Sequence, residues 1–390
     1  MNRFINESVK EIQISGIRKF AQKIEKYDNV IALTLGQPDF PTPAPIKEAA
    51  IHAINQNQTV YTPNAGLPAL RNAASNFLKK KYSLSYDPAD EIIVTVGASQ
   101  ALDVTFRTIL NDDCEVILPA PIYPGYAPII QTCGAKPVFV DTSNSGFKIT
   151  PELLEEQITE KTRCIVLPYP NNPTGVTLTK EELENLANYL SQKDLFILSD
   201  EIYSELTYDT THTSIASYPG MREKTIVING LSKSHSMTGW RIGFIYAPAF
   251  LAQEILKVHQ YNVSCATSIS QYAAITALTD CIDSPIEMAK EYKIRRNYMI
   301  DRLEKMGLPC IKPEGAFYLF PSIKEFNMPS MEFALNLVEK HNLAVIPGEA
   351  FSEYGDSYIR LSYAYSMKEL EIACDRLEEF VTSLRNEKRD

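Results

Sequence analysis

The chain has 390 residues, of which 45% are apolar and 22% charged, and its formal net charge is −10. This balance is typical of an ordinary globular protein, and the length predicts two or three domains. The acidic balance, without a block of Lys and Arg of useful length, argues against binding to nucleic acid, because a phosphate backbone requires a basic patch.

The seven cysteines are scattered without a CxxC pair, and the five histidines do not occur at the spacing of metal ligands. We therefore expect reduced thiols, a cytoplasmic location and no metal site. The first residues, MNRFINESVKEIQISG, have no apolar core, so we expect no signal peptide. No apolar run reaches the ~18–20 residues of a membrane span, so we expect no membrane partner.

The head of the chain predicts a short helix near 16–27 and then an ordered loop, NVIALTLGQPDFPTP, in which Gly36 permits close approach of another group. From about residue 90 to 245, apolar runs alternate with amphipathic stretches, as in strands that helices cover on both faces. The runs are EIIVTV (91–96), CEVILP (114–119), KPVFV (136–140), RCIVLPY (163–169), LFILSD (195–200) and KTIVIN (224–229). This pattern predicts an α/β fold, with a mostly parallel central sheet and helices on both faces.

One of the intervening helices has a clear start signal. Thr179 and Glu182 have the spacing of a capping box, and an i, i+3, i+4, i+7 stripe follows at Leu183, Leu186, Ala187 and Leu190. Beyond 248, helices are predicted over 249–280 and 285–307. GAFYLFPSI, LAVIPG and YIRLSYA then alternate with helical segments and predict a smaller α+β domain. We expect an N-terminal segment (1–40) that packs with the small domain, a large domain (41–285) and a small C-terminal domain (286–390).

Polar residues stand where four of the predicted strands end. The ends are Gly97-Ala98-Ser99 before a helix, PNNPTG with Asn172, Asp200 with Tyr203 beyond it, and GLSKSHSMTGWR with Ser232, Lys233 and Arg241. Each also has an ordinary structural explanation. In the same order, these are a glycine turn between a strand and a helix, a loop turn, a helix N-cap and a lysine exposed to solvent. All four, however, lie at the carboxyl edge of a parallel sheet, where doubly wound folds bind ligands.

Together these groups match the requirements of pyridoxal 5′-phosphate. Lys233 can form an imine with the aldehyde, and Asp200 can keep the pyridine nitrogen protonated so that the ring accepts electrons. Asn172 and Tyr203 can hydrogen-bond the phenolate oxygen. Arg241 offers a planar, two-pronged partner for the phosphate, next to the free N–H groups of the helix that follows Gly97.

The segment SKSHSMTGWRIG resembles the signature of fold-type-I, class I and II aminotransferases, and NNPTG, SDEIY and YIRLS match the family's other blocks in order. The resemblance runs from LGQPDF (35–40) to the C-terminal domain. Within the family, the chain is most similar to the bacterial group of aspartate, aromatic and N-acetyl-L,L-diaminopimelate aminotransferases. The run from YPNNPTGVTL to KVHQYNVSCA looks closest to the last of these.

The resemblance implies the catalytic roles. Lys233 would move a proton between the substrate Cα and cofactor C4′, and Asp200 would pair with the pyridine nitrogen. Tyr203 and Asn172 would hold the phenolate oxygen, and Tyr123 would stack on the ring.

It also implies the binding roles. The phosphate would be bound by Ala98, Ser99, Ser232 and Arg241. Arg360 would bind the substrate α-carboxylate, with Gly36 beside it. Tyr61 would reach the phosphate of the neighbouring subunit in a homodimer whose active sites lie at the subunit interface.

The implied function is transamination by a ping-pong mechanism through the Lys233 imine, from an L-amino acid to a 2-oxo acid such as 2-oxoglutarate. The donor could be N-acetyl-L,L-2,6-diaminopimelate, as in lysine biosynthesis, an aromatic amino acid or aspartate. Ser99 stands where some aspartate-specific members have a lysine, which argues against strict aspartate specificity. Two alternatives remain: a carbon–sulfur β-lyase with the same cofactor, and a regulator with an aminotransferase-like domain, against which the acidic charge argues.

Overall fold

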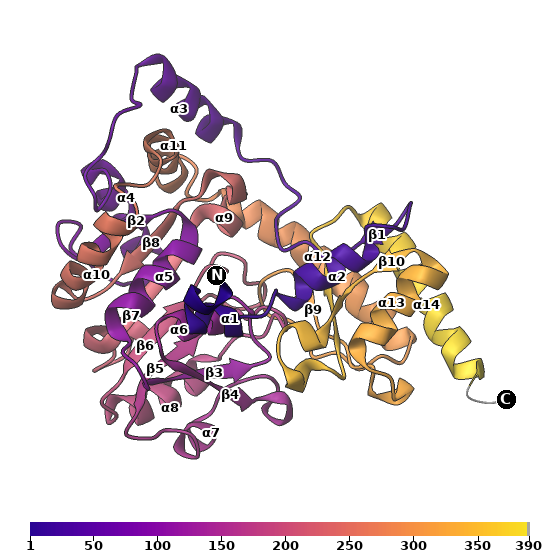
Figure 1. Ribbon diagram of the computed structural model, residues 1–390. Helices are drawn as coiled ribbons and strands as arrows, with labels where there is room; N and C mark the ends of the chain where they lie inside the picture. Colours follow the sequence, from indigo (N-terminus) through magenta and orange to yellow (C-terminus); the bar gives the residue numbers. More distant parts are fainter. Residues whose placement is uncertain (388–390) are drawn as a thin grey trace.

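The computed structural model describes residues 1–387, and a seven-stranded sheet organises the large domain (Figure 1). In spatial order its strands are β2 (Ile92–Thr95), β8 (Gly243–Tyr246), β7 (Thr225–Gly230), β6 (Phe196–Asp200), β5 (Thr162–Leu167), β3 (Glu115–Ala120) and β4 (Lys136–Asp141). Neighbouring strands are parallel except that β8 is antiparallel to β2 and β7. The six predicted strands are confirmed, and β8 is a seventh that the sequence analysis did not identify.

Helices cover both faces of the sheet, which confirms the predicted α/β fold. One face packs against α5 (Gly97–Ile109), α6 (Tyr126–Thr132) and α10 (Ala249–Asn262). The other packs against α4 (Pro68–Tyr82), α8 (Lys180–Ser191) and α11 (Ser268–Leu278). Because both faces are covered, all six residues of β7 are buried, which explains its continuous apolar run.

The predicted helix start is confirmed at α8. The Thr179 hydroxyl accepts from the Glu182 N–H at 3.2 Å, and the Glu182 carboxylate accepts from the Thr179 N–H at 2.7 Å. The four residues of the predicted stripe are all buried. The structure also contains α3 (Ala44–Asn55), which packs on α11, and the short helix α7 (Pro151–Glu155).

The small domain contains an antiparallel sheet in the order β11 (Ile346–Pro347), β12 (Ile359–Ser362) and β9 (Tyr318–Leu319). Its helices are α12 (Ser284–Lys305), which runs toward it from the large domain, α13 (Ser330–His341) and α14 (Met367–Glu387) (Figure 1). The N-terminal segment contributes α1 (Glu7–Glu11), α2 (Gly16–Ile24) and β1 (Ile31–Ala32), which pairs with β10 (Leu343–Ala344). The division at residues 40 and 285 stays a prediction.

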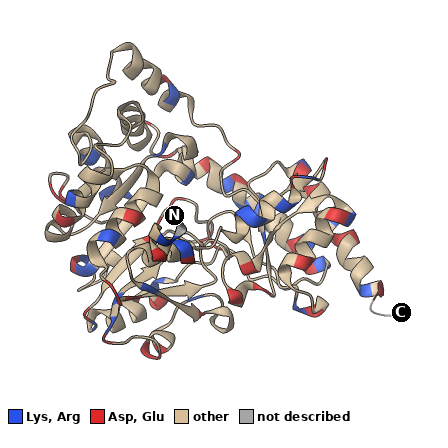
Figure 2. Ribbon diagram, viewed as in Figure 1, with Lys and Arg blue, Asp and Glu red and all other residues tan. Residues whose placement is uncertain are grey.

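Charges of both signs are interspersed over both domains (Figure 2). Across residues 1–387, no helix is long and apolar enough to cross a membrane. The same residues contain no group of three or more His, Cys, Asp or Glu that could hold a metal ion. The seven cysteines are all free.

Candidate active site

The carboxyl ends of the central strands open into a cavity of about 380 Å³ between the two domains. Eleven of the twelve predicted site residues line it: Gly36, Ala98, Ser99, Tyr123, Asn172, Asp200, Tyr203, Ser232, Lys233, Arg241 and Arg360. The twelfth, Tyr61, lies outside the cavity and is 84% exposed. A single chain therefore assembles every predicted group except the one assigned to a neighbouring subunit.

The turn between β2 and α5 is shaped for close approach of backbone to a ligand. Gly97 has a φ of +73°, and a Cβ there would lie 2.4 Å from Nη2 of Arg241. A Cβ on Gly243 would lie 2.6 Å from the Ala98 nitrogen. These glycines leave the first N–H groups of α5 open beside the Arg241 guanidinium, an arrangement that suits a phosphate.

Asp200 ends β6 and is only 7% exposed. The Tyr126 hydroxyl donates to its Oδ2 at 2.7 Å, and the Ile202 N–H donates to Oδ1 at 3.2 Å. Burial raises the pKa of Asp200 to about 6, against the opposing effects of these hydrogen bonds and of Lys233. A buried carboxylate of this kind favours a cationic N–H partner in the cavity, such as a protonated pyridine nitrogen.

Lys233 lies in the short helix α9 (Leu231–Ser234) and donates through Nζ to the carbonyl oxygen of Gly36. Burial lowers the pKa of Lys233 to about 8, and the nearby positive charges of Arg360 and Arg241 lower it further against the attraction of Asp200. The unprotonated amine is therefore accessible near neutral pH, as a nucleophile or a proton acceptor requires.

Arg360 reaches the cavity from β12 and is 2% exposed. Nη1 donates to Asn172 Oδ1 at 3.0 Å and Nη2 to the Thr34 carbonyl at 2.6 Å, while the buried Nε has no acceptor within the protein. The guanidinium stacks on the Tyr318 ring at 4.5 Å. A buried guanidinium N–H without an acceptor is unfavourable, so the site is incomplete until an oxyanion binds there.

Two tyrosines of the site were not assigned from the sequence. Tyr126 hydrogen-bonds Asp200, and Tyr318 places its hydroxyl 2.8 Å from that of Tyr203. Tyr126 begins α6, and its ring lies edge to face against that of Tyr123 at 5.6 Å between ring centres. Tyr318 lies in GAFYLFPSI, which the sequence analysis used only to predict the smaller α+β domain.

Comparison with known proteins identifies the family. The model of the class I and II aminotransferase family matches residues 28–377. The chain belongs to this family. It is 57% identical to the Bacillus subtilis (strain 168) "Probable N-acetyl-LL-diaminopimelate aminotransferase", over 99% of this chain and 98% of that one.

Two further aminotransferases show the range of similar proteins. The Thermococcus litoralis aromatic-amino-acid aminotransferase 2 is 41% identical, over 96% of this chain and 97% of the relative. The solved structure of the Thermus thermophilus aspartate aminotransferase with maleate superimposes with a TM-score of 0.91 at 35% identity, covering 96% of this chain and 99% of that one. This chain is thus an aminotransferase that acts on amino acid and oxo acid substrates.

Aminotransferases of class I and II use pyridoxal phosphate, and the cavity of this aminotransferase fits that cofactor. The glycine-shaped N-terminus of α5 and Arg241 suit the phosphate. The desolvated carboxylate of Asp200 suits the ring nitrogen, and the Lys233 amine, with its lowered pKa, suits the aldehyde. The predicted cofactor is therefore consistent with charge and shape at three separate points.

The lowered pKa of Lys233 predicts how cofactor-free protein takes up pyridoxal phosphate at different pH values. The uncharged fraction of an amine with a pKa of about 8 rises about tenfold from pH 7 to pH 9 and then levels off. We expect the rate constant for the appearance of the bound-cofactor absorption band to follow this curve. A rise of about 100-fold over the same range without a plateau would indicate an ordinary lysine.

Proposed function

We propose that this aminotransferase transfers the amino group of N-acetyl-L,L-2,6-diaminopimelate to 2-oxoglutarate, a reaction of lysine biosynthesis. The supporting observation is the 57% identity, over nearly the full length of both chains, to the Bacillus subtilis protein that carries this activity in its name. The aspartate and aromatic relatives are less similar. Ser99, rather than a lysine, lines the cavity.

The surroundings of the cavity suit a long, doubly charged substrate. Ile17 and Tyr123 line both the active-site cavity and a second cavity of about 670 Å³ beside it. Arg18, an exposed cation of α2, lines the second cavity. A five-carbon side chain that ends in an acylamino group and a distal carboxylate would find both room and a positive charge there.

The chain's own residues have the following proposed tasks. Arg360 and Asn172 orient the substrate through its α-carboxylate. Lys233 Nζ takes the proton from the substrate Cα and returns it at cofactor C4′, while Asp200 holds the proton on the ring nitrogen. When bound, pyridoxal phosphate supplies the aldehyde that accepts the amino group and the ring that accepts the electron pair.

The remaining residues hold the cofactor in place. Tyr203 and Asn172 would hydrogen-bond the phenolate oxygen, and Tyr123 would stack on the ring. The phosphate would be bound by Ala98, Ser99, Ser232 and Arg241. The carbonyl of Gly36, which accepts from Lys233, would lie beside the substrate.

A comparison of amino donors tests the substrate. With 2-oxoglutarate as acceptor, we expect kcat/KM for N-acetyl-L,L-2,6-diaminopimelate to exceed that for aspartate and for phenylalanine by about 100-fold, because only the first fills both cavities. Equal or higher values for aspartate or phenylalanine would contradict the assignment. Pyruvate and ammonia formed from cystathionine without any acceptor would instead indicate a β-lyase.

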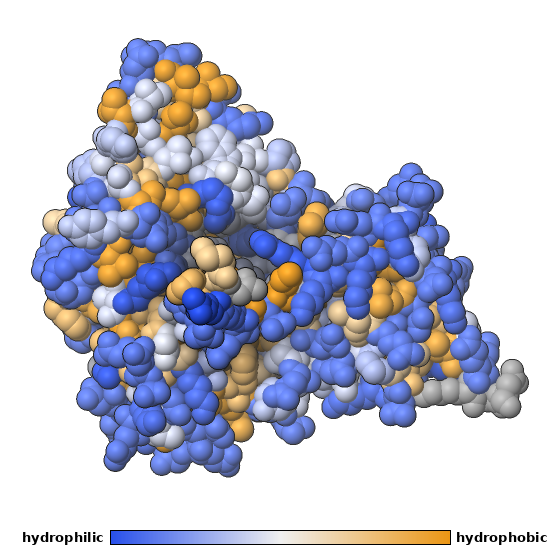
Figure 3. Space-filling model, in the orientation of Figure 1, coloured by the Kyte–Doolittle hydropathy of each residue, from blue (hydrophilic) through white to orange (hydrophobic). Residues whose placement is uncertain are grey.

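We further propose a homodimer in which Tyr61 completes the neighbouring active site. Apolar side chains gather over α3 in the upper part of Figure 3. The exposed apolar residues of this region and nearby are Ile51, Ile54, Val60, Tyr61 and Tyr261. Exposed apolar groups at this density are typical of a protein interface. Sedimentation equilibrium should give twice the mass of the chain, and a monomer at micromolar concentration would contradict the dimer.

The domain division and the location are also proposals. The pairing of β1 with β10 supports an N-terminal segment, 1–40, that packs with a small domain over 286–390, whose last three residues lie outside the described part. The large domain would be 41–285. The seven free cysteines support a cytoplasmic location, and recovery of the protein outside the cytoplasm on cell fractionation would contradict it.

A further inference from the structure

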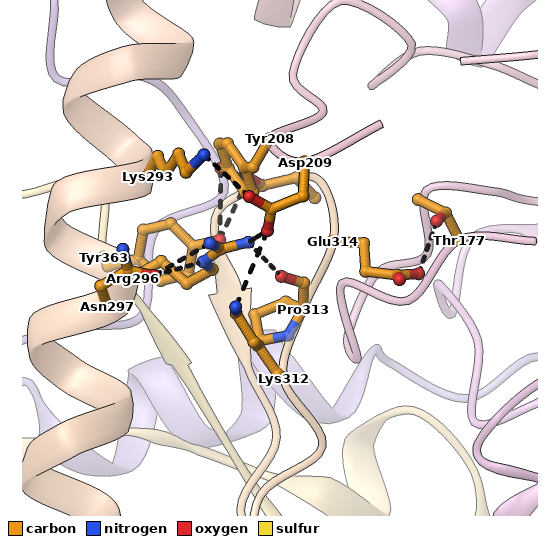
Figure 4. Close-up of polar contacts among 11 residues, drawn as sticks. Thr177, Tyr208, Asp209, Lys293, Arg296, Asn297, Lys312, Pro313, Glu314 and Tyr363 are labelled. Carbon is orange, nitrogen blue, oxygen red and sulfur yellow. Dashed lines mark hydrogen bonds and ion pairs between the residues drawn. The ribbon is translucent and has the colours of Figure 1, made fainter. Parts of the chain in front are cut away.

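Arg296 of α12 is fully buried, although it lies outside the active-site cavity. Its Nη1 donates to Oδ2 of Asp209 at 2.9 Å and to the Pro313 carbonyl at 2.9 Å (Figure 4). Asp209 belongs to the loop after β6, and Pro313 to the loop before β9. One buried guanidinium therefore joins α12, a loop of the large domain and a loop of the small domain.

The charge pair at the centre of this cluster is maintained at neutral pH. Lys293 Nζ lies 2.8 Å from Oδ1 of Asp209. Hydrogen bonds from Lys293 and Arg296 lower the pKa of Asp209 to about 2 against the effect of partial burial. Lys312 of the loop before β9 also pairs with Asp209, with its Nζ 3.8 Å from Oδ2 (Figure 4). Arg296 differs from both lysines because its guanidinium donates hydrogen bonds to Asp209 and to the Pro313 carbonyl at once.

The contacts continue from Arg296 to the backbone at Ala316. The guanidinium lies 4.9 Å from the centre of the Tyr208 ring. The Tyr208 hydroxyl donates to the Ala316 carbonyl, and the Tyr363 hydroxyl also donates to it, at 3.3 Å. Ala316 has a φ of +56°, a left-handed conformation that a non-glycine residue keeps only where its surroundings enforce it.

The backbone at Ala316 is connected to two residues of the active site, Tyr203 and Arg360, through Tyr318. The Ala316 N–H donates to the Leu206 carbonyl at 2.9 Å, which ties this loop to the segment that follows Tyr203. Two residues further on, Tyr318 places its hydroxyl 2.8 Å from that of Tyr203 and its ring against Arg360. A shift of the Ala316 peptide would therefore move Tyr318 relative to both groups.

We propose that Arg296 is a positioning residue, which holds Ala316 through Asp209, Pro313 and Tyr208 and thereby aligns Tyr318 with Arg360 and Tyr203. The inference rests on the proposed roles of Arg360 and Tyr203. Arg296 itself touches no reacting atom. Its effect on the reaction is to keep the substrate-carboxylate site in its bound geometry before the substrate arrives.

The variant Arg296→Met removes the hydrogen bonds while retaining an unbranched apolar stem. We expect KM for the amino donor and for the 2-oxo acid to rise about tenfold, because Arg360 loses its fixed orientation. The dissociation constant of pyridoxal phosphate should change less than about threefold, because the phosphate site at α5 and Arg241 does not contact the cluster. Arg296→Lys, which keeps the charge and one hydrogen bond, should give an intermediate KM.

Lys293→Met is the matched control, since it removes a cation from Asp209 without touching Pro313 or Tyr208. It should leave KM unchanged, and an equal effect in both variants would overturn the proposal. If Arg296→Met does not fold, Tyr208→Phe removes one of the two hydroxyls that reach the Ala316 carbonyl and should still raise KM. An unchanged KM in well-folded Arg296→Met or Tyr208→Phe would also overturn it.

A second readout does not depend on activity. In crystals of cofactor-free Arg296→Met, the hydroxyls of Tyr203 and Tyr318 should lie more than about 3.5 Å apart, beyond hydrogen-bonding distance. An unchanged separation would contradict the positioning role. If the unmodified chain transferred no amino group, the proposed function would fail, while this separation would still decide the structural inference.

Discussion

Replacing Lys233 by alanine is expected to lower kcat for amino transfer at least about 10⁴-fold, because both the covalent attachment and the proton transfer are lost. No other described amine can substitute, since Lys233 is the only lysine that lines the cavity within residues 1–387. Steady-state kinetics with saturating pyridoxal phosphate would measure the loss. Small primary amines added to the solution should restore part of the rate.

The matched control is Lys257→Ala, which removes a 65% exposed lysine of α10 paired with Glu254. Its kcat should stay within about twofold of the unmodified protein, as for most exposed positions away from the site. A Lys233→Ala protein that keeps a tenth of the original kcat would contradict the assigned role.

Replacing Arg360 by methionine is expected to lower kcat/KM for amino acids and 2-oxo acids about 10³-fold. The substitution removes the buried charge that we propose pairs with the substrate carboxylate, and such losses cost about 4 kcal/mol. Methionine retains contact with the ring of Tyr318, so the fold should survive. Single-turnover measurements with each substrate would separate binding from chemistry.

The matched test uses a substrate without the carboxylate. The slow reaction of a simple arylalkylamine should change less than about threefold in Arg360→Met, since Arg360 has no partner on it. Arg107→Met, which removes an exposed arginine of α5, controls for the loss of one positive charge. Equal losses for substrates with and without a carboxylate would show that Arg360 acts on the fold instead.

The same variant has a consequence for Lys233. The positive charge of Arg360 is one of the causes that lower the pKa of Lys233. Without it, the uptake of pyridoxal phosphate should reach its plateau at a higher pH than in the unmodified protein. The pH dependence of cofactor uptake in Arg360→Met therefore tests the proposed roles of Arg360 and Lys233 together.

Much of the large domain could be predicted because strands covered on both faces require continuous apolar runs. Helix α8 could also be predicted, because the capping-box residues and the spacing of the apolar residues over 179–190 both indicated a helix that begins after Thr179. Strand β8 was missed because GFIY is short and follows the lysine segment directly. Helix α3 was missed because it buries only three small or aliphatic residues and leaves Ile51 and Ile54 exposed.

The candidate site was predictable where a residue stands at the end of a strand, as Asp200 does. Contacts between residues far apart in the chain were not predictable. Arg360 and Asn172 were each assigned to the site from the family resemblance, but their contact across 188 positions was not, and neither was Tyr318, whose hydroxyl meets that of Tyr203 across 115. The role of Tyr61 cannot be judged from one chain, because its proposed partner lies in another.

The covalent attachment of the cofactor at one lysine is the central claim. The most direct measurement is reduction of the loaded protein with borohydride, followed by proteolysis and mass spectrometry of the peptides. The account predicts one pyridoxyl-phosphate adduct, on Lys233, with loss of the visible absorption band. An adduct on a different lysine, or none at all in a protein that transfers amino groups, would contradict it.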